Sequence, residues 1–86
     1  MIDKILQLLA SGTCRIIKGR GSSGHILGIP SNKRQSETAR VLLREALHFL
    51  YPLKDDATIH TMLRQVWDNM TFMQYRRLIL HIGEAK

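Results

Sequence analysis

The sequence of 86 residues is poor in cysteine and proline, and it has no apolar run near the roughly 20 residues of a membrane-spanning helix. Its one cysteine, Cys14, excludes a disulfide within the chain and a metal site made of cysteines alone. The apolar part of residues 1–14 is short and is interrupted by Gln7, which does not fit a signal peptide. We therefore expect residues 1–86 to form one cytoplasmic domain.

Chemistry-bearing motifs are also scarce. No histidine stands at a metal-ligand spacing from another histidine or from Cys14. The chain is too short for the complete apparatus of a nucleotide-dependent kinase or dehydrogenase. The adjacent acids Asp55 and Asp56 fit helix caps better than a catalytic pair. We expect a protein that is not an enzyme and that holds neither a metal nor a cofactor.

Acidic residues are missing from most of the first part of the chain. None lies between Lys4 and Ser36, and residues 1–36 carry six basic side chains against Asp3 alone. The rest of the chain is nearly balanced, and the whole chain has a net charge of +6. Basic patches attract polyanions such as nucleic acid. The asymmetry therefore favours a polyanionic partner, without choosing between nucleic acid and an acidic protein.

Hydrophobic periodicity predicts an α+β domain, in which a short N-terminal helix and a β-hairpin precede a three-helix bundle. Apolar residues at helical spacing mark each helix, and two β-branched runs flank a glycine-rich segment. The expected elements are a helix over 1–11, a β-hairpin over 13–30, and helices over 36–51, 56–69 and 71–83.

Residues at the predicted helix ends supply capping signals. Gly12 is expected to end the first helix with a positive φ. Ser36 and Asp55 are placed to cap the second and third helices. Thr71 and Gln74 have the spacing of a capping box, which predicts a new helix at that point.

Two interpretations are open for residues 57–82. One continuous helix would place Gln74 and Arg77 on its core face, whereas a break near 69–70 keeps both outside the core. We expect the break. Two helices joined by a short turn form the unit of helix-turn-helix proteins, although many helical hairpins that bind no DNA share this pattern.

The segment IIKGRGSSGHILGIP, residues 16–30, contains the G-x-G-x-x-G spacing of nucleotide-phosphate loops in Gly19, Gly21 and Gly24. A dinucleotide site needs a helix after the glycines, whereas HILGIP is typical of a strand. The lysine motifs of kinases and of P-loop proteins are absent. The glycines either only shape the turn or also let a basic ribbon approach phosphate groups.

Seven basic residues lie between positions 15 and 44, with Glu37 as the one acid among them. Three belong to the expected hairpin, two precede the second helix, and two follow one face of that helix away from its leucines. Contacts of this kind with phosphates make binding steeply salt-dependent. The candidate nucleic-acid-binding residues are Arg15, Lys18, Arg20, Lys33, Arg34, Arg40 and Arg44.

The last helix offers two candidate surfaces. Gln74 and Arg77 would contact base edges if the unit is a helix-turn-helix, since glutamine and arginine commonly recognise adenine and guanine. The apolar stripe, which we expect to include Phe72, faces the core. Met73 and Leu80 lie off this stripe, so we expect them at an interface between molecules, for example in a homodimer.

Two functional hypotheses follow. The first is a small regulatory protein that binds DNA or RNA, with phosphate contacts from the hairpin and the start of the following helix. The alternative is an adaptor or inhibitor that binds a protein with an acidic surface through the apolar surface of the C-terminal helices. Neither requires a membrane.

Overall fold

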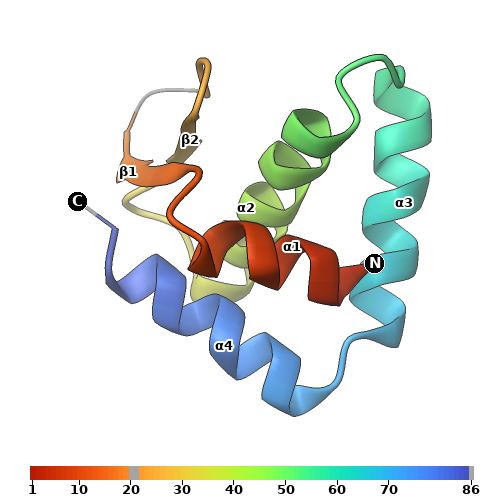
Figure 1. Cartoon of the computed structure of the whole chain (residues 1–86). Helices are drawn as coiled ribbons and strands as arrows, with labels where there is room; N and C mark the ends of the chain where they lie inside the picture. Colours follow the sequence, from red (N-terminus) through yellow and green to blue (C-terminus); the bar gives the residue numbers. More distant parts are fainter. Residues whose placement is uncertain (20–21, 86) are drawn as a thin grey trace.

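Four helices and two short strands make up the part of the chain that the computed structural model describes, residues 1–19 and 22–85 (Figure 1). This order of elements confirms the α+β class. The elements are α1 (Ile2–Ala10), β1 (Arg15–Lys18), β2 (Ile26–Ile29), α2 (Gln35–Leu50), α3 (Asp56–Asn69) and α4 (Phe72–Gly83).

Helix α2 is the central element. It packs against β2, α1, α3 and α4, and in Figure 1 the other helices lie around it. Its predicted apolar stripe forms the middle of the core, because leucines and alanines recur three and four residues apart. The residues of this stripe that are fully buried are Ala39, Leu42, Leu43, Ala46 and Leu47.

Three of the predicted capping signals are confirmed. Gly12 follows the C-cap of α1 with a φ of 76°. The Thr58 N–H donates to Oδ1 of Asp55 at 2.8 Å, and hydrogen bonding from Thr58 lowers the pKa of the Asp55 carboxyl. Thr71 and Gln74 form the complete capping box at the start of α4. The hydrogen bonds at Asp55 and Thr71 each satisfy a backbone N–H that a helix end would leave without a partner.

The prediction that Ser36 caps α2 is wrong. The helix begins at Gln35, so its N-cap is Arg34, which makes no side-chain cap bond, and Ser36 lies inside the first turn. The hydroxyl of Thr38 donates back to the carbonyl oxygen of Arg34 at 3.1 Å. Thr38 is buried, and this hydrogen bond gives its hydroxyl group a partner.

The predicted pair of strands is confirmed, but the strands run in parallel, so the segment is not a hairpin. Arg15 lies opposite Ile26, and Lys18 lies opposite Ile29. Parallel strands usually need a long connection. Here each strand has four residues, which is about 13 Å, so the short segment 19–25 can return the chain to the start of β1.

Local backbone geometry helps this return. Gly19 and Gly24 have φ values of 117° and 57°, which side chains disfavour. Ser23 and Ile26 exchange backbone hydrogen bonds of 3.0 and 2.9 Å just before β2. The alternation of β2 then buries Leu27 and Ile29 in the part of the strand that packs on α2.

The predicted break between α3 and α4 is confirmed. Met70 and Thr71 have extended backbones, and α4 turns away from α3 to lie beside α1 (Figure 1). The expectation that Phe72 faces the core is wrong. The capping box starts α4 at this residue, and its side chain is 73% exposed.

The parallel register predicts which cysteine pairs cross-link. In a Cys14→Ser background, the Arg15→Cys/Ile26→Cys variant should form a disulfide on mild oxidation, because opposed positions bring the Cα atoms within disulfide reach. The Lys18→Cys/Ile26→Cys variant is the control, since only a hairpin would place these residues opposite each other. Mass spectrometry of the oxidised proteins measures the outcome. Preferential cross-linking of the control pair would contradict the parallel pairing.

Loss of the α4 capping box should lower stability. Thr71→Ala removes the acceptor of the Gln74 N–H and should reduce the free energy of unfolding by about 1 kcal/mol, measured by urea denaturation. Thr61→Ala is the matched control, because Thr61 lies in the interior of α3 and caps no helix. Equal effects of the two substitutions would argue against a capping contribution.

Candidate nucleic-acid interface

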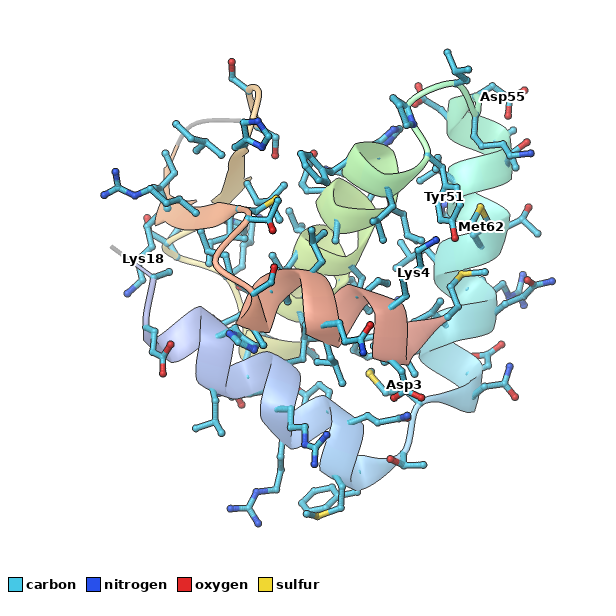
Figure 2. The ribbon with its side chains drawn as sticks, in the orientation of Figure 1. Asp3, Lys4, Lys18, Tyr51, Asp55 and Met62 are labelled. Atoms are coloured by element: carbon cyan, nitrogen blue, oxygen red, sulfur yellow. The ribbon has the colours of Figure 1, made fainter. Side chains whose placement is uncertain are left out.

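The parallel pairing brings Lys18 and Lys33 together. The carboxyl ends of parallel strands lie at the same edge, so the segment after β2 starts beside Lys18. Both lysines line one surface hollow with Gln35 and the C-terminal part of α4. Figure 2 shows Lys18 at the periphery of the molecule, near the end of α4. In a hairpin, Lys18 would lie near the turn and away from Lys33.

Four of the predicted nucleic-acid-binding residues, Arg15, Lys18, Lys33 and Arg34, form what we call the basic edge. They lie on β1 and on the segment between β2 and α2, and all four are exposed. Within residues 1–19 and 22–85, none of the four takes part in an ion pair. Glu84 borders the hollow of Lys18 and Lys33 without reaching ion-pair distance. The basic edge therefore presents positive charge that the described part of the chain does not neutralise.

The other predicted cations on α2 already have partners within the protein. The guanidinium of Arg40 lies over the ring of Trp67, 4.5 Å from its centroid. Nη2 of Arg44 is 3.3 Å from Oε1 of Glu45. Both arginines face the groove between α2 and α3, which His60 also lines. Six of the seven predicted residues are thus divided between two surfaces. Arg20, the remaining one, lies outside the described residues.

Two glycines of the glycine-rich segment, Gly19 and Gly24, lie between the strands β1 and β2. Both have a positive φ, as glycines that shape a turn often do, whereas Gly21 lies outside the described residues. The segment leads into β2 and not into a helix. The helix N-terminus on which a dinucleotide pyrophosphate rests therefore does not follow these glycines.

The two predicted base-contacting residues are placed differently. The amide of Gln74 accepts the Thr71 N–H at 2.8 Å and donates to Oδ1 of Asp3 at 3.1 Å. Its side chain therefore holds α4 to its own cap and to α1. Arg77 is exposed and lines a hollow between α1 and α4 together with Leu80. A bidentate base contact by Gln74 would compete with both hydrogen bonds.

Two contacts of α2 were not predicted from the sequence. Arg40 stacks on Trp67, and Nε2 of His48 lies 3.5 Å from Oδ1 of Asp56. Each contact joins α2 to α3, and helical periodicity predicts contacts only between residues of the same helix. The spacing of Arg40 and Arg44 did indicate a shared face of the helix, but not that α3 lies beside it.

The thiol of Cys14 belongs to the hydrophobic core. Cys14 is 7% exposed, and burial raises the pKa of its thiol. A thiol held in this form is a weak nucleophile. No group of three histidine, cysteine or acidic residues among residues 1–19 and 22–85 is placed to hold a metal ion.

Comparisons of the chain with protein-family models, curated proteins and solved structures gave no match. None of the helices in the described segments is both long enough and apolar enough to cross a lipid bilayer.

Burial of Cys14 predicts slow modification by thiol reagents. At pH 8 the native protein should react with an aromatic disulfide reagent at least about tenfold more slowly than the unfolded protein in urea, because the buried thiol is both shielded and less ionised. The Cys14→Ser/Ser31→Cys variant is the control, since Ser31 is exposed. Equal native rates for the two proteins would contradict the buried position of Cys14.

Proposed function

We propose that the protein binds nucleic acid through the basic edge, as a regulatory protein without catalytic activity. The observation that supports this proposal is the group of four exposed cations, Arg15, Lys18, Lys33 and Arg34, which have no ion-pair partner in the described part of the chain. Lys18 and Lys33 line the same hollow, so part of the group is concentrated in one place.

The chemistry of these side chains suits a phosphate backbone. Like charges that share a surface repel each other, and a polyanion that spans them removes this repulsion while it releases its own counterions. Arg34 and Lys33 also lie at the N-terminal end of α2, where the helix dipole adds positive potential. Contacts by lysine and arginine with phosphates position a protein on nucleic acid without specifying a sequence. The basic edge therefore supports binding to DNA or RNA with little base preference.

The cytoplasm is the compartment that best suits this proposal. Cys14 is a free, buried thiol, and a reducing environment preserves it in that form. Nucleic acid is also abundant there. Binding through the basic edge requires neither a cofactor nor a metal.

A second candidate function, the binding of another protein through α4, rests on a separate observation. Three large apolar side chains of this helix, Phe72, Met73 and Leu80, are more than half exposed. Such groups add little to phosphate binding, whereas an apolar surface of another protein would cover them.

Charge removal at the basic edge tests the proposed function. The variant Arg15→Ala/Lys18→Ala/Lys33→Ala/Arg34→Ala should bind a duplex, a single-stranded DNA and an RNA much more weakly than the unchanged protein. Across a series from about 50 to about 200 mM salt, the slope of log K against log salt on duplex DNA should fall by about 3 to 4, because four phosphate contacts are lost. Fluorescence anisotropy measures both quantities.

A charge-matched variant controls for net charge. Arg40→Ala/Arg44→Ala/Lys54→Ala/Arg64→Ala removes the same charge from α2, α3 and the turn between them, and it should retain most of the affinity. Equal losses in the two variants would show that overall charge, not the basic edge, drives binding. An unchanged protein that binds none of the three nucleic acids at about 50 mM salt would overturn the proposal.

A further inference from the structure

Exposed apolar side chains gather on the outer face of α4. Phe72, Met73 and Leu80 are 73, 61 and 66% exposed, whereas the remaining exposed large apolar residues of the described chain are scattered over other segments. Met73 and Leu80 are seven residues apart and so lie on one face of the helix. A cluster of this kind on a small protein marks an interaction site.

Two arginines lie between these apolar residues. Arg76 and Arg77 are three and four residues from both Met73 and Leu80, which makes them neighbours on the helix surface. Both are exposed, and within the described residues neither takes part in an ion pair. We call the five residues Phe72, Met73, Arg76, Arg77 and Leu80 the α4 ridge.

The α4 ridge borders a groove that can receive side chains. Helices α1 and α4 pack side by side (Figure 1). The hollow between them is lined by Asp3, Leu6, Gln7, Ala10, Arg77, Leu80, His81 and Glu84. Of the two carboxylates in this lining, that of Asp3 accepts a hydrogen bond from the Gln74 amide, and that of Glu84 belongs to the C-cap residue of α4. The groove thus sets Leu6, Ala10 and Leu80 beside Arg77 within a partly polar lining, and a groove between two helices can receive one face of an amphipathic helix.

The charge on the α4 ridge disfavours a second copy of this chain as its occupant. An antiparallel pairing of two α4 helices that sets Met73 against the Leu80 of the other copy also sets Arg76 against Arg77. A parallel pairing sets each arginine against its own counterpart. Both arrangements bring four guanidinium groups to the centre of an apolar contact, where like charges are costly.

The apolar content of the α4 ridge disfavours nucleic acid. Phosphates would pair with Arg76 and Arg77 but would leave Met73 and Leu80 facing a charged, hydrated surface. An occupant that covers the whole ridge must combine apolar side chains at both ends with carboxylates between them. An acidic amphipathic helix has this combination, because residues seven apart and those between them can share one face.

We infer that the α4 ridge binds an acidic amphipathic helix of another protein. Apolar side chains of that helix contact Met73 and Leu80, and its Asp or Glu side chains pair with Arg76 and Arg77. The inference uses none of the residues of the basic edge, so it stands or falls separately from nucleic-acid binding.

A displayed peptide library tests this inference without knowledge of the natural partner. The library consists of helical peptides with leucine fixed at two positions seven residues apart and with Asp, Glu, Asn, Gln, Lys and Arg equally frequent between them. Selection on the full chain should enrich Asp and Glu at the intervening positions. Selection on the Arg76→Glu/Arg77→Glu variant should instead enrich Lys and Arg, whereas Arg44→Glu/Arg64→Glu should keep the original preference.

Affinity measurements locate the binding surface. A selected acidic peptide should bind the Leu80→Asp variant at least about tenfold more weakly, while Leu53→Asp should change its affinity less than about twofold. Leu53 is the matched control because it is exposed and lies away from α4. Leu80 also lines the hollow of Lys18 and Lys33, whereas Met73 does not. The uncharged variant Met73→Ala should therefore weaken peptide binding and leave nucleic-acid binding unchanged, which separates failure of this inference from failure of the proposed function.

Four outcomes would overturn the inference. The first is that selection on the full chain does not enrich acidic residues, and the second is that the Arg76→Glu/Arg77→Glu variant selects the same residues as the unchanged protein. The third is that the protein forms a dimer in solution, which Leu80→Asp converts to a monomer. The fourth is binding to phosphatidylserine vesicles that Leu80→Asp abolishes when no acidic peptide is selected.

Discussion

Burial of the apolar face of α2 is the constraint on which the rest of the structure depends. Leu42, Leu43 and Leu47 have no exposed surface, and every other helix and β2 pack on this helix. Two strands of four residues would be only marginally stable alone. Packing of Leu27 and Ile29 on α2 stabilises them, and it fixes the direction in which the chain leaves β2. The position of the basic edge is therefore a consequence of the core.

Local signals predicted most of the helices but not the pairing of the strands. Three- and four-residue periodicity marks a helix wherever it has a core to face, and the caps at Asp55 and Thr71 depend on neighbours three residues away. The direction of β1 relative to β2 depends instead on packing against α2, which no window of sequence contains. Phe72 was misplaced for a related reason, because the first residue of a helix need not follow the stripe that succeeds it.

The residues of the candidate site were predictable from the sequence, whereas their division between two surfaces was not. Exposure of Arg15, Lys18, Lys33 and Arg34 follows from their polarity and from the absence of acids nearby. The contact of Arg40 with Trp67 joins two helices, and the two hydrogen bonds of the Gln74 amide include one to Asp3 in α1. These partners are chosen by tertiary packing. These contacts engage Arg40 and Gln74 within the protein, whereas the sequence alone could not distinguish these two residues from the other predicted site residues.

The two surfaces differ in chemistry, yet they meet at one place. Leu80 of the α4 ridge lines the same hollow as Lys18 and Lys33 of the basic edge, and Glu84 lines both this hollow and the groove between α1 and α4. Polyanions at the basic edge would repel an acidic helix on the α4 ridge, with a strength that falls as salt screens the charges. Simultaneous occupation of both surfaces would therefore carry an electrostatic penalty, so that each partner weakens the binding of the other by the same factor.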